Sequence, residues 1–497
     1  MSGRYARLSQ DWMLRGWSNQ PRTLVHWRRN EQRTLNKMGF YVAESCDGQT
    51  DFDSFAFLPR HLEMLELLIA EGIAEECPEA RGIEPWQRYR KAHNPRLTGI
   101  HWSVTGWCNL NCRHCYMEAP DRRYGQLPFE AMARLVEQFE QANVLEVSLT
   151  GGEPFLRQDL LSIIQLLADK KIRLTQIYSN GLLITDQHLE GLQSIGFKPS
   201  FQISFDGVGT HDQMRGSTGT EPGVINAIRR LRAAGFAVVV ATSIDQLNLG
   251  ALVATYELMK KLNIQAWRIA APQETGNWRG TASATPIDEQ AETCAPLLEW
   301  WLKDGKPFGI QLGGLYQGGR PRKPGTDQPV RQQPDASRAR PRSRAAGAGL
   351  KRLVDIPDMP AYTPEGYDCG ACREQPNLLP DGTLLPCPGY VDSPVQDRMP
   401  NLLHEDLSKV WTRSFLRGVV DLRKQDLLAA NPECAACALF RECGIGCRAS
   451  ALTLTGNLMS KDPLACEVWK KGYKQRFREM AALAPQAKRT QPEVAQD

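Results

Sequence analysis

Between Ile100 and Ala271 the sequence alternates short apolar runs with longer amphipathic ones, and this repeat limits the fold more than any other feature. The short runs predict strands at 100–104, 144–150, 172–179, 200–205, 237–244 and 265–271. The longer runs carry apolar residues at helical spacing and predict helices at 129–141, 158–170, 186–195, 223–234 and 250–262. Strands that alternate with helices form βαβ units, so we expect a parallel sheet covered by helices.

Six such units are too few to close an eight-stranded barrel. The sequence therefore predicts an α/β fold with a partial (β/α)6 barrel of the TIM type at residues 99–312. In barrels of this kind the active site lies at the carboxyl ends of the strands.

Residues 1–98 predict a small N-terminal domain of the winged-helix kind. Residues 23–27 predict a strand, and residues 38–45 favour a strand over a helix. Residues 61–76 repeat apolar residues at helical spacing up to Gly72, which predicts an amphipathic helix with a glycine stop.

The chain has 14 cysteines, and 11 of them fall in two regions, 108–115 and 369–466. The N-terminal sequence has no secretory signal pattern, so we expect a cytoplasmic protein whose thiols stay reduced. Clustered cysteines in a reduced compartment more often bind metal or do redox chemistry than form disulfides. No run of about 18 apolar residues occurs, so we expect no membrane span.

Cys108, Cys112 and Cys115 share one loop after the first predicted barrel strand, without a fourth cysteine nearby. Four thiolates would complete a structural zinc or iron–sulfur site, whereas three leave one metal position open for catalysis. A zinc knuckle with a distant fourth ligand, or with His114 as that ligand, is the plain alternative.

The second predicted strand runs into Gly151-Gly152-Glu153-Pro154. Glycines let a backbone approach a ligand closely, and a carboxylate pairs well with an ammonium group. A tight turn would explain the same residues. Taken together, and each after a predicted strand, the Cys-x3-Cys-x2-Cys and Gly-Gly-Glu motifs resemble those of radical S-adenosylmethionine (SAM) enzymes.

This resemblance implies a cofactor and a chemistry. The three cysteines would hold three irons of a 4Fe–4S cluster, and SAM would chelate the fourth iron through its amino and carboxylate groups. The reduced cluster would cleave SAM to methionine and a 5′-deoxyadenosyl radical, which takes hydrogen from a substrate C–H bond. His114, Gly151, Gly152 and Glu153 are the matching cofactor-binding residues.

The third and fourth predicted strands end in polar residues that also match the family. Ser179 and Asn180 end one strand, and Ser204 and Asp206 end the next; the resemblance implies that they contact the ribose and the methionine part of SAM. Turn chemistry alone also places Ser, Asn and Asp at strand ends. Arg215, in a further family-like segment at 211–216, would either pair with a carboxylate or be an ordinary surface arginine.

The C-terminal region, 353–480, predicts a loop-rich domain with eight more cysteines. Eight thiols suffice for two four-ligand sites, and spacing alone also allows two zinc sites. The series resembles the SPASM domain of radical SAM enzymes, which implies two auxiliary 4Fe–4S clusters and three clusters in all. The family pattern would give Cys369, Cys372, Cys387 and Cys447 to one cluster, and Cys434, Cys437, Cys443 and Cys466 to the other.

Residues 313–352 are rich in Pro, Gly and Arg and cannot bury a core, so we expect a disordered insertion there and a frayed tail at 481–497. Residues 318–352 carry ten Lys or Arg and two Asp, so the rest of this chain of net charge +4 is net negative. The charge therefore argues against nucleic-acid binding by the folded body, while a phosphate- or RNA-binding arm stays open.

SPASM enzymes mostly modify peptides or proteins. Residues 23–55 resemble a small precursor-peptide recognition domain, in which a leader peptide adds a strand to a sheet edge. A winged-helix cap that only packs against the barrel is the alternative. The expected protein is an enzyme that installs a thioether, a carbon–carbon crosslink or a related change in a ribosomally made peptide, with an electron donor such as flavodoxin or ferredoxin.

Two other functions compete with this one. A sulfatase-type maturase would oxidise Cys or Ser to formylglycine, but such relatives place Asp after the cysteine matching Cys387, where this chain has Pro388. A non-catalytic iron–sulfur or zinc scaffold would not need the three-thiol loop together with Glu153.

Overall fold

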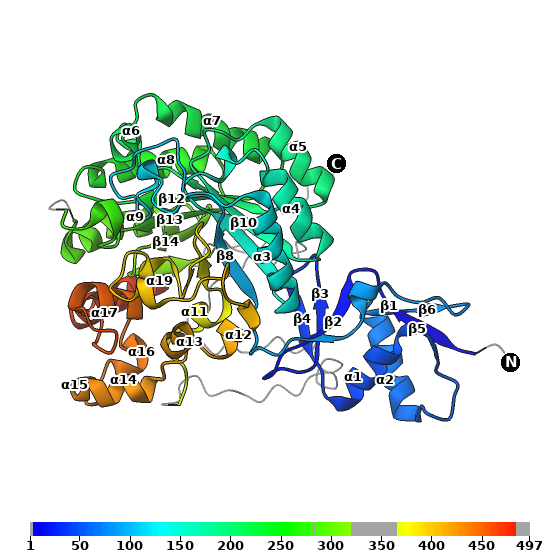
Figure 1. Ribbon diagram of the computed structural model, residues 1–497. Coiled ribbons are helices and arrows are strands. Elements are labelled where there is room, and N and C mark those ends of the chain that lie inside the picture. The colour runs from blue at the N-terminus through cyan, green and yellow to red at the C-terminus, as the bar shows by residue number, and fades with distance from the viewer. Residues whose placement is uncertain (1–2, 282–283, 320–364, 484–497) are drawn as a thin grey trace, which may run out of the picture.

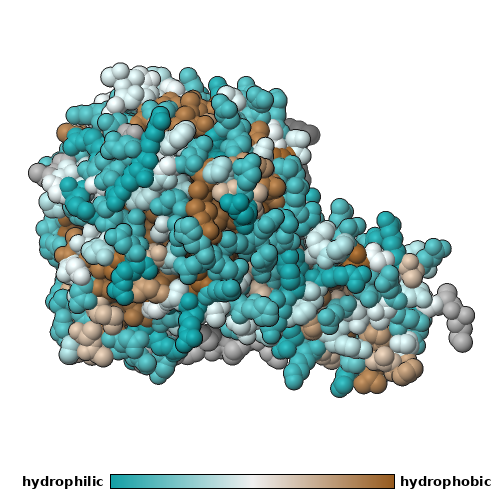
Figure 2. Space-filling view, in the orientation of Figure 1, coloured by the Kyte–Doolittle hydropathy of each residue, from teal (hydrophilic) through white to brown (hydrophobic). Residues whose placement is uncertain are grey.

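The computed structural model of the protein describes residues 3–281, 284–319 and 365–483. Figure 1 shows a small N-terminal part in blue, a central α/β part in cyan and green, and a C-terminal part in yellow to red that packs beside the central part. The visible face in Figure 2 is mostly hydrophilic, with apolar residues in separate patches. In the described ranges, no helix has the length and apolar character that crossing a membrane requires.

One ten-stranded sheet forms the centre, in the order β15-β14-β13-β12-β11-β10-β9-β8-β16-β17. Its strands are β8 (Gly99–Ser103), β9 (Glu146–Thr150), β10 (Arg173–Ser179), β11 (Ser200–Ser204), β12 (Val238–Ser243), β13 (Ala266–Ala270), β14 (Gly309–Leu312), β15 (Tyr316–Gly318), β16 (Asn377–Leu378) and β17 (Leu384–Leu385). Neighbours from β8 to β14 are all parallel. The six predicted strands are β8 to β13, so the predicted α/β partial barrel is confirmed.

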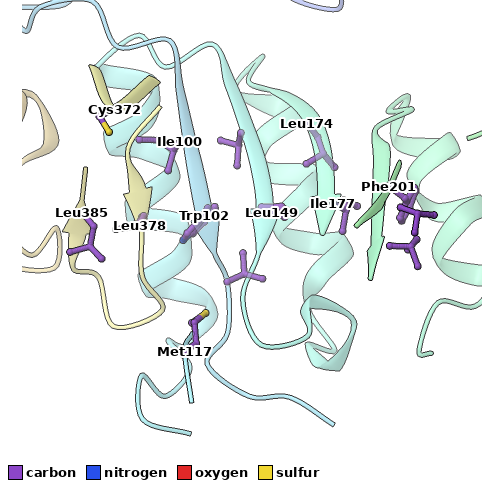
Figure 3. Close-up of a cluster of buried hydrophobic side chains, with 14 of the residues drawn as sticks. Ile100, Trp102, Met117, Leu149, Leu174, Ile177, Phe201, Cys372, Leu378 and Leu385 are labelled. Carbon is purple, nitrogen blue, oxygen red and sulfur yellow. The ribbon is translucent and has the colours of Figure 1, made fainter. Parts of the chain in front are cut away.

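Helices cover the outer face of this sheet. They are α3 (Phe129–Gln141), α4 (Leu160–Asp169), α5 (Asp186–Ile195), α6 (His211–Arg215), α7 (Thr220–Ala233), α8 (Leu252–Lys261) and α9 (Ile287–Lys303). The five predicted helices correspond to α3, α4, α5, α7 and α8. Figure 3 shows outward side chains of the strands, such as Ile100, Trp102 and Leu149, gathered in one buried cluster. Trp102 packs edge-to-face on Phe139 of α3, with ring centroids 5.1 Å apart.

The sheet continues beyond the sixth predicted strand. Helix α9 leads into β14, and β15 returns antiparallel to it. We predicted a disordered insertion from residue 313, and this prediction is wrong for 313–319, because Leu315 is buried and Tyr316 packs on Trp301 with ring centroids 6.2 Å apart. The remainder of the predicted insertion, 320–352, lies outside the described residues.

The C-terminal part extends the same sheet on its other side. Strand β16 pairs in parallel with β8, so Asn377 lies opposite His101. Gln138 of α3 adds a polar link, since its amide donates to the Leu402 carbonyl (2.9 Å) and accepts from the Leu407 backbone (2.9 Å). The C-terminal part, which we call the auxiliary region, therefore shares a sheet with the barrel and packs directly against it.

Short helices fill this part, which we predicted to be rich in loops. They are α11 (Gly370–Glu374), α12 (Leu407–Thr412), α13 (Phe415–Val420), α14 (Lys424–Ala430), α15 (Pro432–Ala435), α16 (Phe440–Cys443), α17 (Arg448–Thr455), α18 (Pro463–Lys470) and α19 (Tyr473–Leu483). Helix α19 runs slightly past residue 481, where we expected the tail to begin. One-turn 3-10 helices lie at Pro85–Gln87, Ala119–Asp121, Pro154–Leu156, Leu249–Ala251, Gly276–Trp278, Pro388–Tyr390 and Gln396–Arg398.

The N-terminal part has two small sheets and two helices. The sheet β5-β1-β6 is made of β5 (Asp47–Asp51), β1 (Tyr5–Leu8) and β6 (Ala74–Cys77), and the sheet β4-β3-β2-β7 of β4 (Glu31–Thr34), β3 (Thr23–His26), β2 (Trp12–Gly16) and β7 (Arg90–Lys91). Met13, Trp17 and Trp27 join the core of the barrel, and the Trp17 indole donates to the Ala142 carbonyl (3.3 Å). The N-terminal part is thus packed against the barrel.

Both helices pack on the N-terminal part's own core: α1 (Lys37–Ser45) and α2 (Pro59–Ala70). The helix predicted at 61–76 is α2, which ends just before Gly72. The strand predicted at 38–45 is wrong, because this segment is α1. The Asn36 side chain caps α1 by accepting from the Gly39 backbone (2.7 Å), and burial of Gly39, Val42 and Ala43 follows helical spacing.

Leu378→Ala tests whether the auxiliary region depends on the shared sheet. Leu378 of β16 is fully buried, so we expect the substitution to cost about 2–5 kcal/mol of unfolding free energy, measured by urea denaturation. Leu403→Ala is the matched control, because Leu403 lies in the same region and is 38% exposed. Equal losses for the two variants would contradict the docking of β16 on β8.

Candidate active site

The loop with Cys108, Cys112 and Cys115 lies at the carboxyl end of β8, where the loops after the parallel strands converge. Backbone hydrogen bonds fix it to later segments: Arg113 donates to the Met214 carbonyl (3.1 Å), and Asn277 donates to the Cys115 carbonyl (3.0 Å). The loop is therefore held by α6 and by the segment after β13, and its thiols occupy the usual position of an active site in such a sheet.

Burial governs the state of these thiols. It raises the pKa of Cys108 to about 12, and the nearby Glu153, Cys112 and Cys115 raise it further against a backbone hydrogen bond. Burial also raises the pKa of Cys115, against backbone hydrogen bonds that include one of 3.4 Å from Ala119 to Sγ. Bound metal would supply the positive charge that deprotonates such thiols.

The Gly-Gly-Glu segment after β9 packs directly on the cysteine loop. Gly152 donates to the Thr105 carbonyl and Glu153 donates to the Trp107 carbonyl, both at 2.8 Å. A Cβ at Gly152 would lie 2.1 Å from the Trp107 carbonyl oxygen, and one at Gly151 would lie 2.4 Å from the Thr105 carbonyl oxygen. We predicted that the glycines allow approach to a ligand; here they also allow the two loops to touch.

Both oxygens of the Glu153 carboxylate accept hydrogen bonds inside the protein. Oε1 accepts from Ser179 Oγ (2.9 Å) and the Phe155 backbone (3.1 Å), and Oε2 accepts from the Asn180 backbone (2.8 Å). The side chain is completely buried, and burial raises its pKa to about 7 against these bonds. The carboxylate therefore ties the end of β9 to the end of β10.

Ser179 and Asn180 thus form hydrogen bonds with neighbouring loops of the protein itself. Asn180 also donates from Nδ2 to Asn109 Oδ1 at 2.8 Å, which links the end of β10 to the cysteine loop. Ser204 ends β11 with a partly exposed side chain. These three predicted residues lie at the same end of the sheet as the thiols.

Asp206 is fully buried in a charged group beneath the thiols. Its Oδ2 pairs with Arg215 Nε (2.7 Å) and lies 3.8 Å from His114 Nε2, while its Oδ1 accepts from the Ser243 backbone (2.9 Å). Arg215 Nη1 also reaches Cys112 Sγ at 3.5 Å. Of the two interpretations of Arg215, the structure supports pairing with a carboxylate, because the side chain is buried.

Burial lowers the pKa of His114 to about 4, and the charge of Asp206 only partly opposes this. The ring is therefore neutral at physiological pH. Its buried Nδ1 has no hydrogen-bond partner among the described residues. An unsatisfied buried nitrogen beside the cysteine loop fits a polar ligand there.

The eight auxiliary cysteines gather in two groups. Burial raises the pKa of Tyr390, and the charges that raise it further come from Cys387, Cys372, Cys447 and Cys369. The pKa of Cys372 is raised by hydrogen bonds with Cys369 and Cys387. One group therefore lies near Tyr390. It consists of Cys369, Cys372 and Cys387 together with Cys447, the N-cap of α17.

The second group lines a single pocket with Phe440 and Trp469; its members are Cys434, Cys437, Cys443 and Cys466. The two groups interleave along the chain, since Cys447 belongs with the earlier cysteines. A buried Arg448–Asp368 ion pair (3.1 Å) and a hydrogen bond from the Cys447 backbone to Asp462 (2.9 Å) fix this crossing.

The donor sets fit iron–sulfur clusters in chemistry: three thiols at the strand ends and four in each auxiliary group. In the described part of the chain, no three His, Cys, Asp or Glu side chains are positioned to share a single metal ion. The fit therefore rests on thiol grouping and burial.

The inner face of the sheet is polar, which sequence reasoning missed. The alternating burial of β11 and β13 leaves Gln202 and Arg268 partly exposed between buried apolar neighbours, and Tyr178 of β10 is partly exposed beside the buried Ile177. His101 of β8 is bonded through Nδ1 to Ser148 Oγ (2.8 Å) and meets Tyr178 edge-on at 4.9 Å. The sequences of β11 and β13 carry this signal as large apolar residues at every second position, whereas Thr175 and Gln176 interrupt the alternation in β10.

Comparison with known proteins identifies the central domain. The radical SAM superfamily profile matches residues 102–259. The chain is 26% identical to the AdoMet-dependent heme synthase of Nitratidesulfovibrio vulgaris over 75% of its length and 95% of that protein. It is also 26% identical to the PqqA peptide cyclase of Gluconobacter oxydans over 73% of its length and 88% of that protein.

Among solved structures, Streptococcus suis SuiB bound to precursor peptide SuiA superposes with a TM-score of 0.64 at 14% identity. The match covers 93% of this chain and all of SuiB, so the likeness in fold extends beyond the barrel. Residues 102–259 form a radical SAM domain.

His101→Gln tests the buried polar face through pH. Burial lowers the pKa of His101 to about 4, below its ordinary 6.5. Between pH 6.5 and pH 4 this histidine is therefore protonated in the unfolded chain and neutral in the folded chain. The folded state therefore loses stability over this range. Between pH 7 and pH 5 the variant should lose about 2 kcal/mol less than the parent protein, measured by urea unfolding under anaerobic conditions.

His404→Gln, at an exposed position, is the control and should keep the full acid sensitivity. His114 and His211 also have pKa values lowered to about 4 by burial, so some sensitivity remains in every variant. An unchanged difference between pH 7 and pH 5 in His101→Gln would contradict the burial of a neutral imidazole.

Proposed function

We propose that this radical SAM enzyme is a maturase that modifies a ribosomally made peptide. The observation that carries the proposal is the three-thiol loop locked by Gly152 and Glu153 onto the ends of β9 and β10. The peptide substrate is supported by the PqqA peptide cyclase and by SuiB, whose fold with a bound precursor peptide resembles nearly the whole chain.

Cys108, Cys112 and Cys115 would hold a 4Fe–4S cluster with SAM on the remaining iron. The bound pair supplies one-electron cleavage of SAM, which lets its 5′ carbon take a hydrogen atom from an unactivated C–H bond and leave as 5′-deoxyadenosine. Gly151, Gly152, Ser179, Asn180 and Ser204 would shape the cofactor pocket, and His114 would offer its unsatisfied Nδ1.

The charged side chains would act through position. Because both Glu153 oxygens are engaged, we assign that carboxylate to holding the loops, and contact with the amino group of SAM to the loop backbone. Asp206 would hold Arg215 against Cys112, where the guanidinium balances thiolate charge in a buried site.

The two auxiliary thiol groups would hold one 4Fe–4S cluster each. Four thiols per group leave no iron position open, so these clusters would carry electrons rather than bind substrate. Electrons would come from a carrier such as flavodoxin or ferredoxin, in the reducing cytoplasm, where free thiols persist.

The N-terminal part would receive the leader of the precursor peptide. Strand β4 ends the sheet β4-β3-β2-β7 and has partly exposed residues, so it offers an edge to which an extended peptide can add. Its rigid attachment through Trp17 would hold the leader at a fixed position relative to the strand ends.

A second candidate is a reaction in heme synthesis, favoured by heme synthases that match over three quarters of the chain. Formylglycine formation is disfavoured, because the aspartate expected directly after Cys387 is replaced by Pro388, the first residue of a 3-10 helix. A scaffold without catalysis would release no 5′-deoxyadenosine.

Anaerobic reconstitution followed by assay of 5′-deoxyadenosine and of peptide mass tests the function. The parent protein should hold about twelve irons, and Cys112→Ala and Cys437→Ala should each lose about four. Cys112→Ala should abolish SAM cleavage, whereas Cys437→Ala should keep cleavage but yield no modified peptide.

Cys294→Ala is the matched control, since Cys294 is buried in α9 away from both thiol regions. It should retain iron, cleavage and product. Modified peptide from Cys437→Ala would overturn the electron-transfer role, and a protein that cleaves SAM but acts only on tetrapyrroles would favour the second candidate.

A further inference from the structure

The inner face of the barrel sheet carries a cation that faces polar groups. The interiors of closed eight-stranded barrels are filled by layers of branched apolar side chains, and this partial barrel is not closed. Here the corresponding positions on β10, β11 and β13 are Tyr178, Gln202 and Arg268, all partly exposed. Their apolar neighbours Ile177, Ile203 and Trp267 turn outward and are fully buried. The inner face is therefore built to meet something polar.

Arg268 is held, but its charge is not balanced by an acid. Nη1 donates to Gln202 Oε1 at 2.8 Å, and this amide is neutral. Of the residues that the structure describes, no Asp or Glu forms an ion pair with Arg268. Two buried arginines of the barrel are paired with acids: Arg157 with Asp159 and Arg215 with Asp206, both at 2.7 Å.

An unpaired guanidinium on a partly desolvated wall costs free energy unless a ligand compensates it. Arginine has five N–H donors in a planar fork that matches a carboxylate in two parallel hydrogen bonds. Gln202 uses one donor and Tyr178 shares another hydrogen bond with the guanidinium, so three of the five N–H donors remain for an anion.

Arg268 also lies within reach of the thiol loop through aromatic side chains. Its charge and a hydrogen bond lower the pKa of Tyr178, although burial raises that pKa more strongly. Burial raises the pKa of Tyr116 most, and the charge of the adjacent Cys115 raises it further. Tyr178 makes a smaller contribution in the same direction. The hydrogen bond between Arg268 and Tyr178 thus places the guanidinium beside β10, the strand that ends at the edge where the thiol loop lies.

We propose that Arg268 is a specificity-determining residue that binds a carboxylate of the substrate. Resting on the proposed peptide maturase, the inference is that the modified segment carries an acidic side chain close to the carbon that reacts. Arg268 then fixes the register of that segment, because the carboxylate docks at a set place on β13 while the neighbouring carbon faces the thiol loop.

The test is a binding titration that needs no turnover. The reconstituted holoenzyme with SAM is titrated by calorimetry with three acetylated peptides. Two are blocked at both ends, acetyl-Gly-Glu-Gly-amide and its Gln analogue, and the third, acetyl-Gly-Gly-Gly, has a free C-terminal carboxylate. Glutarate is the small-molecule arm. The parent protein should bind the Glu peptide about tenfold more tightly than the Gln peptide, as expected for charge-assisted hydrogen bonds.

Arg268→Met should reduce this preference to less than about twofold, and Arg268→Lys should keep part of it because the charge remains. Arg229→Met, on the exposed surface of α7, is the control and should behave as the parent protein. Circular dichroism and iron content check that each variant is folded and loaded.

Equal binding of the Glu and Gln peptides by the parent protein, no binding of either, or a preference that survives in Arg268→Met would each overturn the proposal. Tighter binding of the C-terminal carboxylate than of the Glu side chain would also overturn the acidic-residue assignment. If glutarate binds through Arg268 and no peptide is ever modified, the carboxylate site stands while the peptide function fails, so the two failures are distinguishable.

Discussion

The site depends on direct contact between two loops that lie far apart in sequence. The cysteine loop after β8 and the Gly-Gly-Glu loop after β9 share backbone hydrogen bonds of 2.8 Å, and a Cβ at Gly152 would lie 2.1 Å from the Trp107 carbonyl oxygen. The Glu153 carboxylate then carries the contact across to β10 through Ser179 and Asn180. Because parallel strands bring these loops to one edge, the fold and the thiol geometry cannot be separated.

The strong periodic elements could be predicted from the sequence, and the marginal ones could not. Strands β8 to β13 and five of the helices follow from hydrophobic spacing, because each buries one face completely. The α1 segment was misassigned, since its apolar run lacks a clear period and its helical start depends on the Asn36 cap. Strand β15 was missed because three residues anchored by a contact with Trp301 give no pattern of their own.

The candidate site divides in the same way. The spacing of the cysteines predicts them as metal ligands. The role of Glu153 in joining two strand ends depends on three hydrogen bonds that no local sequence pattern predicts. The grouping of Cys447 with Cys387 came from a resemblance and agrees with the charges felt by Tyr390. This grouping is physically possible because Cys447 is the N-cap of α17 and Arg448 is buried against Asp368.

Charge explains why the buried centre and the open inner face are built differently. Around the thiols, burial raises the pKa of Cys108 and lowers that of His114, so the site without metal favours neutral side chains. Arg215 stays charged there because Asp206 compensates it. Arg268 lies on the same sheet without such a carboxylate among the described residues, and its neighbours Tyr178 and Gln202 are partly exposed. One arginine thus belongs to the permanent structure of the centre, and the other is left for a partner that brings its own negative charge.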